Sequence, residues 1–327
     1  MLAFVLRRLF QAALVMLAVA FVAFSLFNYV GDPVNLMLGQ DATPEQKKDL
    51  RESLGLDQPD YVQFAVFVKN AMKGEFGLSL KQGRLVSTLI KERLPATLEL
   101  ALAAAVIALA GGLLMGVYTA LRRDGWLSQL LLTVSLIGVS LPNFLIGILL
   151  ILVFAVSWQV LPSYGRGDVT MLGWWSTGLL TASGLKALVL PAFTLSLFPM
   201  TLIMRLVRSE MLEVLRTDYI KFARARGLTN RAVHFGHALK NTLVPVMTIT
   251  GLQLGSIIAF AIVTETVFQW PGMGFLFIQS VQFADIPVMA AYLVLISLVF
   301  VTINLIVDLL YYVVDPRLRF DRAAGAH

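Results

Sequence analysis

Long apolar runs constrain this chain more than any other feature. Each is about 20 residues or longer, and a helix of roughly 20 apolar residues crosses about 30 Å of hydrocarbon. The 327 residues are 58% hydrophobic and 14% charged, whereas soluble domains carry roughly a quarter charged residues. The sequence therefore predicts an all-α polytopic membrane protein with six transmembrane helices, over residues 9–30, 97–121, 129–157, 187–208, 246–268 and 289–314.

The run at 129–157 contains Pro142 and could form one kinked span or two short helices. A single span there places the N-terminal, C-terminal and Arg122/Arg123 basic residues on one side, as the positive-inside rule requires. On this topology the cytoplasmic segments hold 15 Lys and Arg, against 2 in the short outer loops. Both termini are therefore predicted to be cytoplasmic. Cleavage after Ala18-Val19-Ala20 remains an alternative, although the apolar run continues to Phe27.

The first outer loop, residues 31–95, carries helix signals of its own. Thr43-Pro44-Glu45-Gln46 is a capping box with a stop at Gly55, and Pro59 opens a second helix that ends at Gly74. A third amphipathic piece is expected from Arg84 to Leu94, ending at Pro95. These helices could lie on the outer leaflet or form a docking platform for an outside partner. The second helix would present an apolar stripe of Tyr61, Phe64, Ala65, Val68 and Met72.

Catalytic and metal-binding signatures are missing from the sequence. It has no cysteine and no phosphate-binding loop of the G-x-x-x-x-G-K-[ST] type, and His234 and His237 have no third ligand beside them. Few acidic residues fall within the spans, and Glu99, Glu265 and Asp308 all lie near span ends. No catalytic residue, metal site or cofactor is therefore expected in this chain. No nucleic-acid partner is expected either, because the net charge of +6 follows from the positive-inside bias.

A basic polar segment, residues 216–247, separates two of the apolar runs. Thr217 is predicted to cap a helix that runs to Arg226, Gly227 to break it, and Thr229 or Asn230 to cap a second helix that ends near Asn241. Basic side chains there could contact anionic lipid headgroups. Aromatic and small residues are mixed among the charges, which favours a helix that rests in a protein groove.

The stretch YIKFARARG, residues 219–227, followed by LTNRAVHFGHALKNTLVP, resembles the cytoplasmic loop of permease subunits of ABC importers of the dipeptide, oligopeptide and nickel group. Further segments in the same order and spacing extend the resemblance over nearly the whole chain: Gly31-Asp32-Pro33, Leu54 to Pro59, Gly74 to Ser79, Leu94 to Leu98, Glu265 to Phe268, Trp270 to Gly274, Asp308, and Asp315-Pro316-Arg317. The general importer pattern begins Glu-Ala-Ala, where this chain has Lys221, Phe222 and Ala223, and Lys240 replaces a proline. These departures point to the peptide branch.

The resemblance implies that the polar segment contains a coupling helix that fits a cleft of an ATP-hydrolysing subunit. The residues it assigns to ATPase coupling are Tyr219, Phe222, Ala223, Arg224, Ala225, Arg226 and Gly227. The implied partners are a second, related permease subunit, two ATP-binding subunits that hold ATP and Mg, an extracytoplasmic substrate-binding protein and membrane lipid. The implied location is the bacterial cytoplasmic membrane.

Four parts follow for the chain: residues 1–30 with the first span, the extracytoplasmic loop 31–95, a five-helix core 96–314 with a cytoplasmic coupling loop at 209–245, and a tail at 315–327. The function implied is ATP-driven import by alternating access. An ion-coupled secondary transporter and a membrane scaffold or receptor remain alternatives. Dipeptides, oligopeptides, nickel chelates, glutathione and opine-like compounds all stay open as substrates, and no substrate-path residue is predicted.

Overall fold

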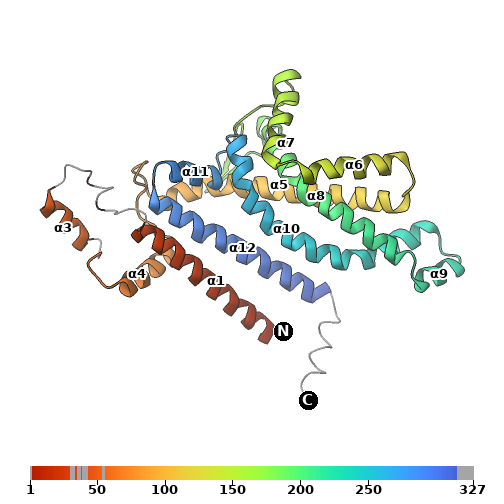
Figure 1. Ribbon diagram of the computed structural model, residues 1–327, viewed down its shortest axis with the longest axis horizontal. Coiled ribbons are helices and arrows are strands. Elements are labelled where there is room, and N and C mark those ends of the chain that lie inside the picture. The colour runs from red at the N-terminus through yellow and green to blue at the C-terminus, as the bar shows by residue number, and fades with distance from the viewer. Residues whose placement is uncertain (1, 30–33, 35–37, 39–42, 54–55, 315–327) are drawn as a thin grey trace, which may run out of the picture. The chain divides into compact units, whose positions relative to one another are not determined.

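A computed structural model describes the whole chain except residues 1, 30–33, 35–37, 39–42, 54–55 and 315–327. The expected turn at Gly31-Asp32-Pro33, the stop at Gly55 and the motif at 315–317 lie outside the described residues. The chain divides into two compact units. Helices α5 (Val86–Leu121) and α12 (Ile286–Val314) each contribute residues to both (Figure 1).

The first unit contains residues 1–97, 170–177 and 271–301. It includes α1 (Leu2–Tyr29), α3 (Pro44–Ser53), α4 (Asp60–Lys73), α11 (Met273–Gln282) and the first parts of α5 and α12. Helix α4 packs on α1 through aromatic rings, with Phe24 5.5 Å from Phe64 and 6.0 Å from Phe67 between ring centroids. One helix start and one helix stop follow the sequence signals. Thr43 and Gln46 form the predicted reciprocal capping box, and α4 ends at Gly74, whose φ is 75°.

Two expectations for this unit are wrong. Residues Arg84 to Leu94 do not form a separate helix ended by Pro95, because α5 continues through that proline to Leu121. The missing N–H of Pro95 is offset by the burial of Leu89, Ala96 and Leu100. The expected apolar stripe of α4 is also rotated. Tyr61 and Met72 are exposed, and the residues that touch α1 are Phe64 and Phe67.

A buried carboxylate, Asp285 before α12, holds a loop of the same unit. It accepts hydrogen bonds from the Ser79 hydroxyl and from the backbone amides of Leu80 and Lys81, the last two at 3.1 and 3.4 Å. The unit also contains a short hairpin that the all-α expectation omitted, in which β1 (Thr170–Leu172) pairs antiparallel with β2 (Trp175–Thr177).

The second unit contains residues 98–169, 178–270 and 302–327. Its central element is α8 (Ala182–Val214), which α5, α7 (Asn143–Leu150) and α10 (Leu239–Val267) all approach (Figure 1). Glycines allow α5 to come close to α8. A Cβ atom on Gly112 would lie 2.7 Å from Ile203, and one on Gly116 would lie 2.6 Å from Val207. This is the small-residue packing that membrane helices favour.

The run at 129–157 forms two helices and a π-helical turn in place of one kinked helix. Helix α6 (Trp126–Ser140) ends at Leu141, and α7 continues into the π-helical turn η1 (Ile151–Ser157) at an angle of 113° to α6 (Figure 1). Pro142 explains the break, because it lacks an amide hydrogen and forces the residue before it into an extended conformation. Leu141 has ψ 138°.

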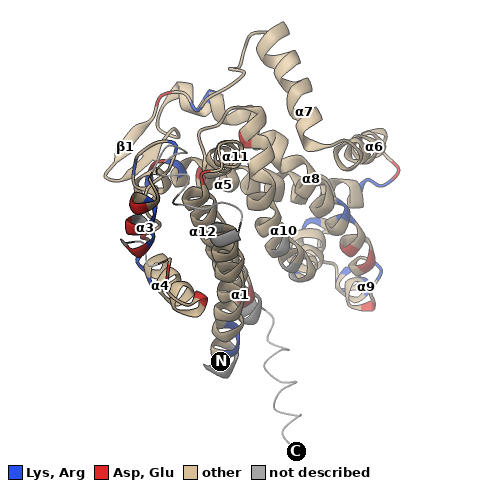
Figure 2. Ribbon diagram, turned by 60° about the vertical axis from the view of Figure 1, so that its left-hand side comes forward, with Lys and Arg blue, Asp and Glu red and all other residues tan. Residues whose placement is uncertain are grey.

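Five described helices are long and apolar enough to cross a membrane: α1, α5, α8, α10 and α12. A sixth span is obtained if α6 and the bent α7–η1 are taken together. The structure is thus mostly helical, as predicted, with five or six candidate spans. Charged side chains are sparse on these helices and frequent on α3, on the loop before α6 and around α9 (Asp218–Ala225) (Figure 2).

Candidate functional site: the coupling segment

Helix α9 forms from residues 218–225, within the polar segment. Asp218 lies in its first turn, where a negative charge interacts favourably with the positive end of the helix dipole. Its carboxylate also pairs with Lys221, with 2.8 Å between Oδ1 and Nζ. Thr217 stands at the predicted N-cap position of α9, but its side chain makes no capping hydrogen bond there. Its hydroxyl instead donates a 2.6 Å hydrogen bond back to the carbonyl of Val214, the last residue of α8. Thr217 lies on the short connection between α8 and α9, where its side chain can serve either helix.

Gly227 ends α9 as predicted. Its φ is 80°, a left-handed conformation that glycine adopts without strain. Its amide donates to the carbonyl of Arg224 at 2.9 Å, and the amide of Leu228 donates to the carbonyl of Ala223 at 3.3 Å. This pair of bonds is a Schellman motif, which satisfies carbonyls that the helix end would otherwise leave open.

One face of α9 is buried in a hydrophobic cluster that joins several helices. Ile220 is fully buried and Ala223 nearly so. The cluster also includes residues from the ends of α5 and α8 and from the turn that precedes α10: Val117, Ala120, Val207, Met211, Val233 and Ala238. Fully burying one aliphatic side chain contributes about 1.5–3 kcal/mol. Helix α9 is therefore fixed to α5, α8 and α10 by its apolar face.

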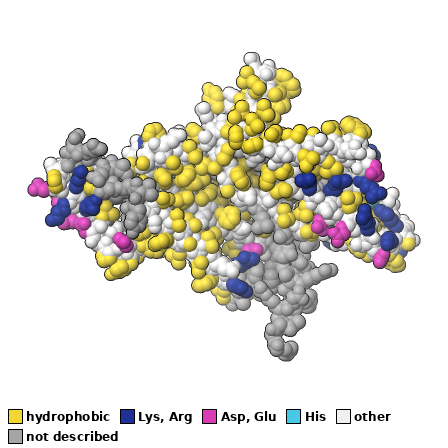
Figure 3. Space-filling view, viewed as in Figure 1, with side chains coloured by type: hydrophobic (Ala, Val, Ile, Leu, Met, Phe, Trp, Pro, Cys, Tyr) yellow, Lys and Arg dark blue, Asp and Glu magenta, His cyan; other side chains and the backbone are white. Residues whose placement is uncertain are grey.

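The opposite face of α9 is exposed and combines aromatic with basic side chains. The Phe222 side chain is 64% exposed and that of Tyr219 42%. Arg224 and Arg226 are exposed on the same short helix and its C-cap. Leu228 and Phe235 add exposed apolar area beside them. Basic side chains gather over α9 and the adjoining end of α8 (Figure 3).

The second half of the polar segment does not form a separate short helix, contrary to the expectation. Thr229 does cap the next element, since its hydroxyl accepts from the Ala232 amide at 3.3 Å. That element is a π-helical turn, η2 (Ala232–Ala238), which runs directly into α10. Residues 239–244 contain neither glycine nor proline, so the chain has no local reason to leave the helix near Asn241.

A hydrogen bond of 2.6 Å from Asn241 Nδ2 to the Tyr219 hydroxyl ties α9 to the start of α10. His234 lies in η2, and burial, with the nearby positive charge of Arg224 as a second cause, lowers the pKa of its imidazole. The side chain of His237 is exposed, and no group of three or more His, Cys, Asp or Glu side chains within the described ranges could hold a metal ion.

Of the seven residues assigned to coupling, six are exposed on or just after α9: Tyr219, Phe222, Arg224, Ala225, Arg226 and Gly227. Ala223 faces inward beside Ile220. Ile220, Leu228 and Phe235 are not among the residues predicted from the sequence. The spacing of Ile220 and Ala223, three residues apart, was the available signal for the inward face.

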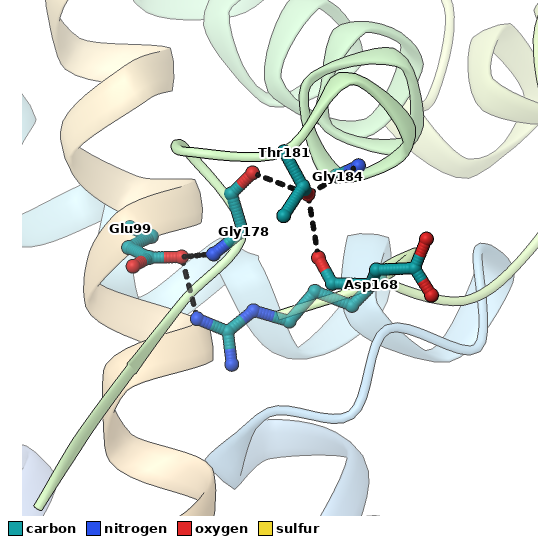
Figure 4. A network of polar contacts seen from close by, with 6 residues as sticks. Glu99, Asp168, Gly178, Thr181 and Gly184 are labelled. Atoms are coloured by element: carbon teal, nitrogen blue, oxygen red, sulfur yellow. Dashed lines mark hydrogen bonds and ion pairs between the residues drawn. The ribbon is translucent and has the colours of Figure 1, made fainter. Parts of the chain in front are cut away.

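A buried ion pair in the same unit joins Glu99 on α5 to Arg166 in the loop after η1, with 2.5 Å between Oε2 and Nη2. Glu99 also lies 3.4 Å from the amide of Gly178. Beside it the Thr181 hydroxyl lies between the Asp168 and Gly178 carbonyls and caps α8 through the Gly184 amide (Figure 4). The carboxylate of Glu99 therefore holds a loop in place.

Comparison with known proteins gives consistent matches. The model for a binding-protein-dependent transport system inner membrane component matches residues 112–320, and the model for the N-terminal part of such components matches residues 1–101. The chain is 36% identical over 333 residues to the dipeptide transport system permease protein of Alkalihalophilus pseudofirmus, covering 98% of this chain and all of that protein. It is 39% identical to a putative peptide transport system permease protein of Brucella abortus, again covering 98% of this chain and all of the relative.

A third relative is the probable D,D-dipeptide transport system permease protein of Escherichia coli. It is 37% identical, over 95% of this chain and 96% of the relative. A chain of the MetNI methionine ABC transporter, in an inward-facing crystal form, superposes with a TM-score of 0.56 at 20% identity. This superposition covers 69% of the present chain and 96% of the other. At that identity the likeness concerns the fold alone.

Proposed function

Because this chain belongs to the family of inner membrane components of binding-protein-dependent transport systems, we propose that it is the permease subunit of an ATP-driven importer of peptides or similar small solutes. ATP hydrolysis lies on separate subunits, which bind ATP and Mg, and the chain itself is not an enzyme. Full-length relatives named for dipeptide, peptide and D,D-dipeptide transport support the peptide class. The family favours this function over the alternatives of an ion-coupled carrier or a scaffold.

In the proposed topology, the chain crosses a bacterial inner membrane six times, and α6 with α7–η1 counts as one broken span. Both termini and the coupling loop 209–245 face the cytoplasm. Residues 31–95 face outward, where a substrate-binding protein docks. The lysines and arginines concentrated in the expected cytoplasmic segments support this orientation.

One observation carries the proposed mechanism: the two faces of α9 differ completely. Its outer face offers Phe222 and Tyr219 between arginines, a combination typical of anchors that fill a protein groove. Its inner face is embedded in the cluster shared with the ends of α5 and α8. A movement imposed on the outer face would therefore displace the spanning helices and would not merely bend a loop.

Each of the seven assigned residues then has a part in coupling. The rings of Tyr219 and Phe222 fill the groove of the ATPase, and Arg224 and Arg226 orient against acidic residues at its rim. Ala223 fixes the helix to the cluster. Ala225 leaves room for close approach, and Gly227 allows the chain to turn away. One chain supplies one such segment, so two ATPase subunits require a second permease, related to this one.

The proposal is tested by mass spectrometry of the proteins that co-purify with this chain from native membranes in mild detergent. We expect a second permease, one or two ATPases and, with added substrate, a binding protein. A Tyr219→Ala/Phe222→Ala variant lacks both aromatic anchors. The ATPases should no longer co-purify with it, whereas the second permease should. Recovery of the chain alone with transport intact would refute the assignment.

A further inference from the structure

A groove of about 470 Å³ lies between α6 and α8, within the second unit and close to the C-terminal end of α8. Four polar residues line it: Arg205, Arg208, Ser209 and Thr133. No acidic side chain belongs to the lining, although Glu210 follows Ser209 directly in sequence. We propose that this groove binds the headgroup of an anionic phospholipid of the inner leaflet, with one acyl chain along α6. This site goes beyond the transport function; it rests on the proposed orientation of the chain in the membrane and not on transport itself.

The charges support an anionic ligand. Arg205 and Arg208 stand three residues apart and so project from the same face of α8. Within the described part of the chain, neither makes an ion pair with a carboxylate. Two guanidinium groups with nearby hydroxyls are the donors that phosphate recognition uses.

The rest of the lining supports a lipid over a free anion. Leu132, Leu136 and Leu212 provide apolar walls next to the arginines. Leu132 and Leu136 are one turn apart on α6, so they form a strip along the helix axis that suits an acyl chain. Inorganic phosphate would leave this strip uncovered. A lipid with a negative headgroup matches both parts of the groove.

The depth of the groove also fits an interfacial ligand. Helix α6 begins at Trp126, which is 76% exposed, and tryptophan is enriched at the level of lipid headgroups. Leu132 lies six residues further along α6, roughly 9 Å at 1.5 Å per residue. The groove therefore starts just below the headgroup level, where a phosphate can reach the arginines while its acyl chain enters the hydrocarbon.

Native mass spectrometry of the full chain, purified from nanodiscs of equal phosphatidylglycerol and phosphatidylcholine, tests this site. The wild type should retain phosphatidylglycerol preferentially. The Arg205→Gln/Arg208→Gln variant should lose that preference about tenfold or more. Arg122→Gln is the matched control, because it removes an exposed charge from the loop before α6. It should keep the preference. An equal loss in Arg122→Gln would show diffuse attraction to charge and would overturn the proposal, as would full retention in the double variant.

Two further measurements separate other occupants. If millimolar inorganic phosphate displaces the lipid from the wild type, the ligand is a free anion and the lipid proposal fails. The chain contains no cysteine, so Thr133→Cys gives a single reporter on the groove. Crosslinking of that cysteine to a second permease in native membranes would show that a protein covers the groove. Capture of a lipid analogue that carries a maleimide on its headgroup, by addition of the Thr133→Cys thiol to the maleimide and without a crosslink to protein, supports the lipid.

Discussion

The side-chain amide of Asn241 donates a 2.6 Å hydrogen bond to the hydroxyl of Tyr219, 22 residues earlier in the chain. The bond links α9 to the first turn of α10, so it holds the outer face of α9 in one orientation. A hydrogen bond of this kind contributes about 1 kcal/mol net.

Removing this bond while keeping the ring should weaken coupling modestly. Tyr219→Phe retains the aromatic anchor, and we expect substrate-stimulated ATP hydrolysis by the reconstituted complex to fall by roughly fivefold at most. Asn241→Ala should have the same effect, and the double variant should be no worse than either single one. Additive losses in the double variant would mean that the two side chains act independently.

Gly227 should tolerate alanine poorly and proline not at all. Nothing lies within 4 Å of a Cβ atom there, so alanine meets only the strain of φ 80°, about 1–2 kcal/mol. Proline cannot adopt that φ, and it removes the amide that bonds to Arg224. We expect Gly227→Pro to abolish uptake with normal membrane insertion. Gly236→Ala is the control, because its Cβ also enters open space without a positive φ. Normal uptake by Gly227→Pro would exclude a coupling role.

The buried pair of Glu99 and Arg166 should be costly to break from one side. Arg166→Met leaves a buried carboxylate without its partner, and breaking such a pair costs about 3–5 kcal/mol. We expect a large fall in the melting temperature of the detergent-solubilised chain, and partial recovery in Glu99→Gln/Arg166→Met. The exposed pair of Arg84 and Glu92 provides the comparison. Its Glu92→Gln variant should melt as the wild type does.

The coupling segment should lose stability in mild acid through His234. The pKa of this imidazole is lowered in the folded chain, first by burial and second by Arg224. Above the unfolded pKa of about 6.5 both states are neutral and stability is complete. As the pH falls below that value, the unfolded state binds the proton more readily, so stability decreases until the folded pKa is passed. We measure the melting temperature as a function of pH. His234→Gln should make it nearly independent of pH between pH 7 and pH 5, and Arg224→Gln should reduce the slope. An unchanged slope in both variants would contradict this cause.

Local signals in the sequence predicted the starts and stops of several helices. Thr43 with Gln46, Gly74 and Gly227 act as expected, because each acts through bonds to residues a few positions away. Signals that depend on tertiary packing failed. Pro95 could not be recognised as a helix interior, since the burial of Leu89, Ala96 and Leu100 that offsets it is a property of the folded chain and not of the local sequence. The Thr217 hydroxyl could bond to the end of α8 or to the start of α9, and the local sequence did not show that it bonds to α8.

The candidate site was predicted in part. Its exposed residues follow from charge and aromatic content in one stretch, and the family resemblance gave them a role. The inward anchor of Ile220 and the bond from Asn241 depend on packing between α8, α9 and α10. The pairing of Glu99 with Arg166 joins residues 67 positions apart, which a single sequence without aligned relatives does not reveal.

The break at Leu141 and Pro142 restricts what can surround this chain in a bilayer. The end of α6 and the start of α7 each leave backbone groups without intrahelical partners, and hydrocarbon offers them none. Asn143 at this turn lines a small cavity together with Gln253, whose buried Oε1 accepts no hydrogen bond from the residues that the structure describes. In the proposed topology, which counts α6 with α7–η1 as one broken span, this turn therefore needs water or another protein beside it in place of acyl chains.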